Sequence, residues 1–330
     1  MSELTRLLPW FGAKVDLARE IVNQASVSNA GGTRRPSFVG VPFVGGYSVP
    51  LAFARAGVRS ILCGDLHRDL QNAARCLASE HGPWIVERLR SIPMSESSFG
   101  VSMGARVRSV AVLDDLDSAP TVDHAARAVA WMATEWMGNN GTAGTTSEPH
   151  FNVRFDDGGG DPSTRLRNFG DGLMGAVELL RCMTHKCEDF GVTLGRIKDG
   201  PNVAIYADPP YLTKTRSSGD YLHDFDESDG DGLFGGGGER DEHDRLAAAL
   251  NGFDEARVVV SYYPHERLDK LYPGPHDGGR WRRIAIPCPN RSQAASGGDV
   301  ETVIELLLVN GEVAPPVLKD AMVLGFGVGA

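Results

Sequence analysis

The stretch SFVGVPFVGGYSVPLAFARAGVRSILCGD, residues 37–65, decides the fold class. An apolar run from Ser37 to Pro42 is typical of a buried strand, and Gly45-Gly46 then interrupt it before a helical pattern from Val49 to Arg55. A second apolar run, Val58 to Gly64, predicts another strand. Strands separated by helices indicate a parallel α/β sheet.

The same alternation continues on both sides of this stretch. Helical spacing of apolar residues predicts helices at 14–25, 67–79, 122–137, 243–250 and 265–272. Further apolar runs predict strands at 202–207, 256–262, 280–286 and 302–309. Residues 92–170 show no alternation of strands and helices, so we expect a smaller inserted domain there.

Composition excludes several classes of protein. The 330 residues contain no apolar run of the roughly 18 residues that span a bilayer, so no membrane partner is expected. The opening residues, MSELTRLLPWFGAK, lack the apolar core of a secretory signal, which predicts a cytoplasmic protein. The five cysteines form no C-x-x-C pair and are odd in number, which favours reduced thiols over disulfides or a zinc site. We expect no bound metal.

The formal net charge of −10 argues against nucleic-acid binding, because phosphate recognition relies on Lys and Arg. Most of this charge lies in residues 224–244, DFDESDGDGLFGGGGERDEHD, which hold nine acidic residues and one Arg. The rest of the chain is therefore close to neutral. The acidic segment contains four consecutive glycines and few apolar residues, which predicts a flexible acidic loop at 224–242.

The residues Asp208-Pro209-Pro210-Tyr211 follow the predicted strand at 202–207 directly. Ligands of open α/β sheets bind at the carboxyl ends of strands, and two prolines hold such a turn rigid. The exocyclic amino group of adenine or cytosine is a poor nucleophile, because its lone pair is delocalised into the ring. Acceptors for its two hydrogens, Asp208 Oδ and the Pro209 carbonyl, would favour a pyramidal nitrogen with an available lone pair. A base flipped out of a duplex would stack on Tyr211.

The glycine turn within VGVPFVGGYSV, residues 39–49, is a weaker signal. Glycines after a strand let the backbone approach a cofactor, although the same pattern is common in plain tight turns. Asp65 ends the next strand about 20 residues on, where an acidic residue can accept hydrogen bonds from both hydroxyls of a cofactor ribose. An Asp in this place is also a common helix N-cap, so both interpretations stay open.

Taken in order, these segments resemble the Dam-type DNA adenine methyltransferases. The segments that are similar to family motifs are LLPWFGAK, PFVGGYSV, ILCGDLHRDL, the Gly-rich stretch with FNVRF, HKCEDF, DPPY, and the closing SQAASGGDVETVIELLLVN. The resemblance implies a Rossmann-like methyltransferase fold with a seven-stranded, mostly parallel sheet. It also implies a catalytic domain at 1–90 and 171–330, interrupted by a target-recognition insertion at 91–170.

The family pattern further implies which residues bind and react. S-adenosylmethionine would be bound by Trp10, Lys14, Phe43, Gly45, Gly46, Asp65, Asp189, Phe190 and Asp208. The catalytic residues would be Asp208, Pro209, Pro210 and Tyr211. Basic residues near these motifs are candidates for contact with double-stranded DNA, namely Arg154, Arg165, Arg167, Lys214, Arg216 and Arg291.

We therefore expect a monomer that transfers a methyl group from S-adenosylmethionine to the N6 amino group of a flipped-out adenine in DNA. Two alternatives stay open. The target is instead cytosine N4 or an RNA base, or the chain is a relative that binds DNA without methylating it. Val41, where the family usually has an acidic residue, and the acidic insertion favour the second alternative. Ala13 replaces the second glycine of the N-terminal motif.

Overall fold

The apolar run near residue 260 forms strand β5 (Arg257–Tyr262), whose side chains are all buried. A strand covered on both faces needs such a continuous apolar sequence. β5 pairs in parallel with β4 (Val203–Ala207), and β4 pairs in parallel with β1 (Phe38–Val41). β4 is thus an interior strand with a parallel neighbour on each side.

This computed structural model describes residues 3–10, 12–27, 33–138, 143–145, 147–151, 162–212, 241–289 and 302–324. The chain divides into two compact units. The first unit comprises the described parts of residues 1–16 and 44–189, and the second unit comprises those of 17–43, 190–218 and 224–330.

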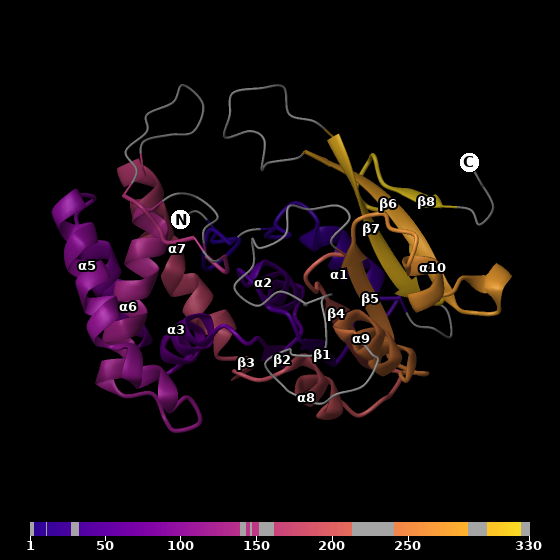
Figure 1. Cartoon of the computed structure of the whole chain (residues 1–330), viewed down its shortest axis with the longest axis horizontal. Coiled ribbons are helices and arrows are strands. Elements are labelled where there is room, and N and C mark those ends of the chain that lie inside the picture. The colour runs from indigo at the N-terminus through magenta and orange to yellow at the C-terminus, as the bar shows by residue number, and fades with distance from the viewer. Residues whose placement is uncertain are drawn as a thin grey trace. The chain divides into compact units, whose positions relative to one another are not determined.

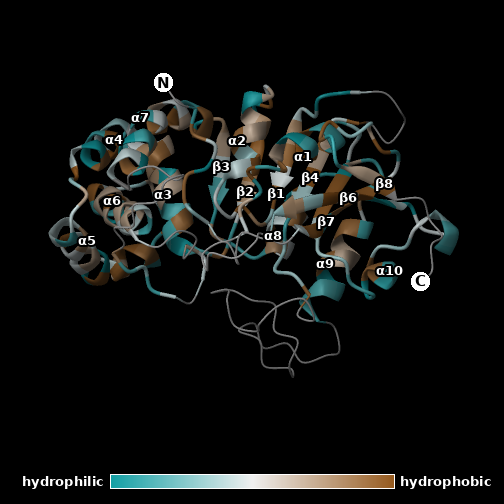
Figure 2. Cartoon of the chain, turned by 90° about the horizontal axis from the view of Figure 1, so that it is seen from above, coloured by the Kyte–Doolittle hydropathy of each residue, from teal (hydrophilic) through white to brown (hydrophobic). Residues whose placement is uncertain are grey.

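Beyond β5, the sheet of the second unit becomes antiparallel. β5 pairs with β7 (Thr302–Asn310), β7 pairs with β6 (Trp281–Pro289), and β6 pairs with the short β8 (Met322–Leu324). The apolar character of β6 and β7 is visible along their ribbons (Figure 2). The helices of this unit are α1 (Ala18–Ala25), α8 (Phe190–Gly195), α9 (Glu242–Asn251) and α10 (Leu268–Leu271), with a 3₁₀ turn at Pro275–Asp277.

The first unit contains one parallel pair of strands, β2 (Ile61–Gly64) and β3 (Met183–Lys186), which run in register from Ile61↔Met183 to Gly64↔Lys186. Its helices are α2 (Ser48–Arg55), α3 (Arg68–Ala78), α4 (Gly82–Ser91), α5 (Glu96–Arg108), α6 (Val122–Met137) and α7 (Pro162–Leu180), with a 3₁₀ turn at Val110–Asp114. Helices α5 and α6 lie side by side (Figure 1).

Side-chain caps explain where the main helices begin. Thr121 and His124 form a reciprocal capping box at the start of α6. His67 accepts a hydrogen bond from the Leu70 amide at the start of α3. Asp241 accepts from the amides of the first turn of α9. The last two residues of the predicted acidic loop at 224–242 are therefore the N-cap and the first residue of α9. The other residues of this loop lie outside the described part of the chain.

The α/β class is confirmed, but two finer expectations are corrected. The described residues contain eight strands, two in the first unit and six in the second, instead of the seven expected. Helices α5 and α6, from the expected insertion at 91–170, belong to the same compact unit as β2 and β3. The recognition role of that region stays a prediction.

Candidate active site

Asp65 lies at the carboxyl end of β2, as the sequence predicts, and its carboxylate holds the glycine turn. Oδ2 accepts hydrogen bonds from the amides of Val44 and Gly45, both at 3.1 Å, and Oδ1 accepts from the His67 amide at 2.9 Å. A carboxylate offers about four acceptor positions, three of which these bonds use. The observed role of Asp65 is to fix the turn against the start of α3, and its bond to a ribose stays a prediction.

Trp10 packs against the same glycine turn. Gly45 has φ +53°, and a Cβ added to Gly46 would lie 2.8 Å from Trp10 Cβ. On another side of the indole, Gly144 has φ +83°, and a Cβ there would lie 2.4 Å from Trp10 Cζ2. The Leu7 amide donates to the Gly46 carbonyl at 2.9 Å and ties this N-terminal segment to the turn. Three glycines are thus needed to seat one partly exposed indole ring.

Lys14 lies near this segment but is buried, and its Nζ donates to the Gly12 carbonyl at 2.8 Å. A buried ammonium group needs such a partner because desolvation of an unpaired charge is costly. The structure therefore places Lys14 in the same unit as Trp10, Gly45, Gly46 and Asp65.

His67 and Trp131 are residues of this region that the sequence did not single out. The His67 ring centroid lies 5.3 Å from that of Trp10, edge-on, and 5.2 Å from that of Trp131. The two aromatic neighbours fix the imidazole, which also caps α3. The motif HRDL marks this position only through its place after Asp65.

Asp208-Pro209-Pro210-Tyr211 follow β4, so they stand at the carboxyl end of an interior parallel strand, as predicted. Pro209 is buried and Asp208 is half-buried. Tyr211 is only 5% exposed, and its ring packs edge-on against that of Tyr263 with centroids 4.5 Å apart.

The Tyr211 hydroxyl joins two carboxyl groups. It donates to Glu305 Oε1 at 2.6 Å and lies 3.2 Å from Asp208 Oδ1. Burial, followed by the charges of Asp208 and Glu305, raises the pKa of Tyr211 well above its ordinary value. The phenol therefore stays protonated at neutral pH. Glu305 was missed because it lies inside an otherwise apolar strand, β7.

Phe43 and Phe190 form one aromatic cluster in the second unit. Their ring centroids lie 5.4 Å apart, and the Arg245 guanidinium carbon lies 4.0 Å above the Phe190 ring. Asp189 follows β3 in the first unit and is partly exposed. Contact of Phe190 and Asp189 with a cofactor adenine stays a prediction.

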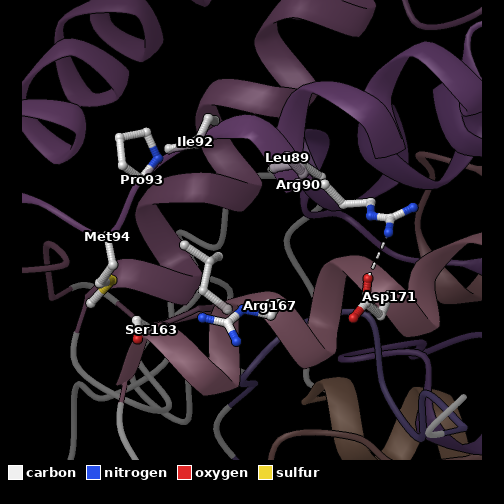
Figure 3. A pocket seen from close by; sticks show the side chains of 9 residues that line it. Leu89, Arg90, Ile92, Pro93, Met94, Ser163, Arg167 and Asp171 are labelled. Carbon is white, nitrogen blue, oxygen red and sulfur yellow. Dashed lines mark ion pairs between the residues drawn. The ribbon is translucent and has the colours of Figure 1, made fainter.

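Two of the six candidate DNA-binding residues are described. Arg165 is half-buried and Arg167 is exposed, both on α7, whereas Arg154, Lys214, Arg216 and Arg291 lie outside the described residues. Arg167 lines a hollow of about 390 Å³ between the C-terminal end of α4 and the start of α7. In this hollow Arg90 pairs with Asp171 at 3.0 Å, while Arg167 has no ion-pair partner in the described part of the chain (Figure 3).

Within the described ranges, no three His, Cys, Asp or Glu side chains gather as a set that would hold a metal ion. No helix there combines the length and apolar content that crossing a membrane requires. All five cysteines are free thiols.

A search of protein-family models and a search of curated proteins both find no match to this chain. The geometry of the two units therefore carries the functional argument without support from a relative.

Proposed function

We propose that the chain is an S-adenosylmethionine-dependent methyltransferase that methylates the N6 amino group of adenine in double-stranded DNA. The observation that carries the proposal is the position of Asp208-Pro209-Pro210-Tyr211 at the carboxyl end of β4. β4 pairs directly with β1, although some 160 residues separate them in sequence, so the chain order changes at this point of the sheet. Ligands of open α/β sheets bind at such a point.

The segment Asp208–Tyr211 at the end of β4 fits the chemistry of an exocyclic amino group. Asp208 supplies a carboxylate and Pro209 a backbone carbonyl, which are acceptors for two N–H hydrogens. Proline leaves this segment without backbone N–H donors at two consecutive positions. A site with acceptors and few donors favours an amino group over a carbonyl group of a base.

Side chains of the first unit fit the chemical groups of S-adenosylmethionine. Trp10 is partly exposed beside the glycine turn, and the Asp65 carboxylate lies at the same turn. A bound S-adenosylmethionine would supply the electrophilic methyl group. Trp10, Gly45, Gly46 and Asp65 of this unit would hold it.

Methylation of cytosine N4 or of RNA needs the same two acceptors, so these targets stay as alternatives. A DNA-binding protein without transferase activity is also compatible with Val41, which is fully buried on β1 and cannot meet a charged ammonium group.

One experiment separates these functions. The protein is incubated with methyl-labelled S-adenosylmethionine and either unmethylated duplex DNA or RNA, and the digested nucleosides are identified by mass spectrometry. Labelled N6-methyladenine from DNA supports the proposal, and labelled N4-methylcytosine or an RNA product replaces it with an alternative. Without labelled product, calorimetry shows whether S-adenosylmethionine binds at all, and absence of binding at millimolar concentration overturns the proposal.

A further inference from the structure

Glu305 is a buried acid in an apolar strand. It is 6% exposed on β7, opposite Ile286 of β6, and is followed along the strand by Leu306 and Leu307, which are also buried. A carboxylate in such surroundings is costly unless it is hydrogen-bonded. The contact of Glu305 with the Tyr211 hydroxyl therefore needs an explanation.

The Tyr211 hydroxyl has one proton and lies against two carboxyl groups. The oxygen–oxygen distance is 2.6 Å to Glu305 and 3.2 Å to Asp208. Short O–H···O distances are typical of bonds to an ionised acceptor, so the proton is donated to Glu305. The Tyr211 oxygen then presents a lone pair to Asp208 Oδ1.

The Tyr211 oxygen and Asp208 Oδ1 then face each other with lone pairs, and a hydrogen bond forms between them when one of the two oxygens gains a proton. Asp208 can gain it, because its protonated form donates to the Tyr211 oxygen while Tyr211 still donates to Glu305. The negative charge of Glu305 favours the same protonation, since a nearby like charge raises the proton affinity of a carboxylate.

We propose that Glu305, acting through Tyr211, is a positioning residue that prepares Asp208 to take the proton released from the methylated amino group. This inference rests on the proposed function. Asp208 is ionised before the reaction and accepts a hydrogen bond from the amino group, and afterwards it is a carboxylic acid that donates to Tyr211.

The proposed step transfers one methyl group and releases one proton. The lone pair of the amino nitrogen forms the bond to the methyl carbon, and the carbon–sulfur bond breaks with its electron pair left on sulfur. The nitrogen is then cationic and still carries two hydrogens. One leaves as a proton to Asp208, and the nitrogen keeps the electron pair of that N–H bond.

Other titratable groups lie near this chain of contacts, on β4, β5 and α9 and in the segment that follows β5. Tyr206 of β4 bonds Ser261 Oγ at 2.9 Å, and Tyr262 of β5 bonds His243 Nδ1 of α9 at 3.0 Å. Tyr263 packs on the Tyr211 ring. The pKa of Tyr262 is raised well above its ordinary value by burial, so it keeps its proton across the working range of pH.

The first test measures protonation without any reaction. Infrared spectra of the cofactor-free protein with ¹³C-labelled aspartate carboxyl groups are recorded against pH, and Asp208→Asn identifies the Asp208 band. We expect Glu305→Gln to move the protonation midpoint of Asp208 down by about one pH unit, because the amide keeps the bond from Tyr211 but removes the charge. Glu312→Gln is the matched control, since Glu312 is exposed and pairs with Arg282.

The second test measures single-turnover methylation of duplex DNA against pH. The acid limb of the profile should move down with Glu305→Gln by the same amount, and Tyr211→Phe should move it in the same direction because protonated Asp208 loses its acceptor. A rate that falls equally at every pH, with no movement of the infrared midpoint, would mean that Glu305 is merely structural and would overturn the inference. If wild type methylates no nucleic acid but the infrared shift is present, the proposed function fails and the coupling of Glu305 to Asp208 stands.

Discussion

The Tyr47 hydroxyl lies 2.8 Å from His185 Nδ1. His185 Nε2 lies 3.2 Å from the Leu180 carbonyl oxygen, which can only accept, so Nε2 carries the proton and Nδ1 accepts from Tyr47. Gln71 Oε1 lies 3.4 Å from the same hydroxyl, and the Gln71 amide nitrogen has no hydrogen-bond partner among the described residues. This network holds Tyr47 at φ +66°, directly after the glycine turn.

The network makes stability depend on pH. Burial lowers the pKa of His185 to about 4, whereas in the unfolded chain it has the ordinary value near 6.5. As pH falls, the unfolded state therefore binds the proton first. The free energy of unfolding should drop by roughly 3 kcal/mol between pH 6.5 and pH 4 on account of this group.

Urea unfolding at a series of pH values checks this expectation. His185→Gln should flatten the dependence in that window, and His276→Gln, at an exposed position, should leave it unchanged. Equal slopes for wild type and His185→Gln would show that another group causes the loss.

Asp69 and Arg127 should contribute far more to stability than surface ion pairs do. Both are buried, and Arg127 Nε and Nη2 each lie 2.7 Å from one carboxylate oxygen of Asp69. Replacement of one partner leaves the other charge buried without its counter-charge, so Asp69→Asn should cost about 3–5 kcal/mol of unfolding free energy. Asp114→Asn breaks the exposed pair with Arg68 and should cost less than about 1 kcal/mol. Chemical denaturation measures both, and similar costs would refute this assignment.

Several buried strands and the capped helices α3, α6 and α9 were predictable from sequence because local pattern and tertiary environment agree. The apolar run at 256–262 forms β5, and α6 has the bounds predicted for the helix at 122–137. β3 was missed because its sequence is MTHK and only Met183 is buried, so no apolar pattern marks it. β8 is three residues long and was missed for the same reason.

The candidate site was predictable only in part. Position directly after a predicted strand singled out Asp65 and Asp208, whereas Trp10 was expected only from the family resemblance. Contacts between residues distant in sequence cannot be read in this way. Glu305 lies 94 residues from Tyr211 in sequence. Nothing in the pattern VIELLLVN distinguishes it from a solvent-exposed glutamate on a strand.

Gly46→Ala should displace Trp10. The new Cβ would lie 2.8 Å from Trp10 Cβ and 3.1 Å from the Leu8 carbonyl oxygen, and neither atom is the end of a flexible side chain. We expect a destabilisation of about 1–3 kcal/mol, altered tryptophan fluorescence and weaker binding of S-adenosylmethionine by calorimetry. Gly175→Ala is the matched control, because its Cβ meets no atom within 4 Å in α7 and should stabilise by about 0.5–1 kcal/mol. Unchanged fluorescence and affinity in Gly46→Ala would contradict the seating of Trp10 on this turn.

Asp208→Ala should abolish methyl transfer while the protein remains folded. Asp208 is half-buried beside the Tyr211 hydroxyl, and loss of its carboxylate removes the acceptor for one amino hydrogen. Removal of one such preorganised group typically lowers kcat about 100-fold to 1,000-fold. Asp208→Asn keeps one acceptor oxygen without the charge, so its rate should fall between those of wild type and Asp208→Ala. Asp254→Ala, which breaks an exposed pair with Arg280, is the control for a surface aspartate and should keep the wild-type rate. Single-turnover assays with labelled cofactor and thermal unfolding separate chemistry from folding, and near-wild-type transfer by a folded Asp208→Ala protein would remove this residue from the reaction.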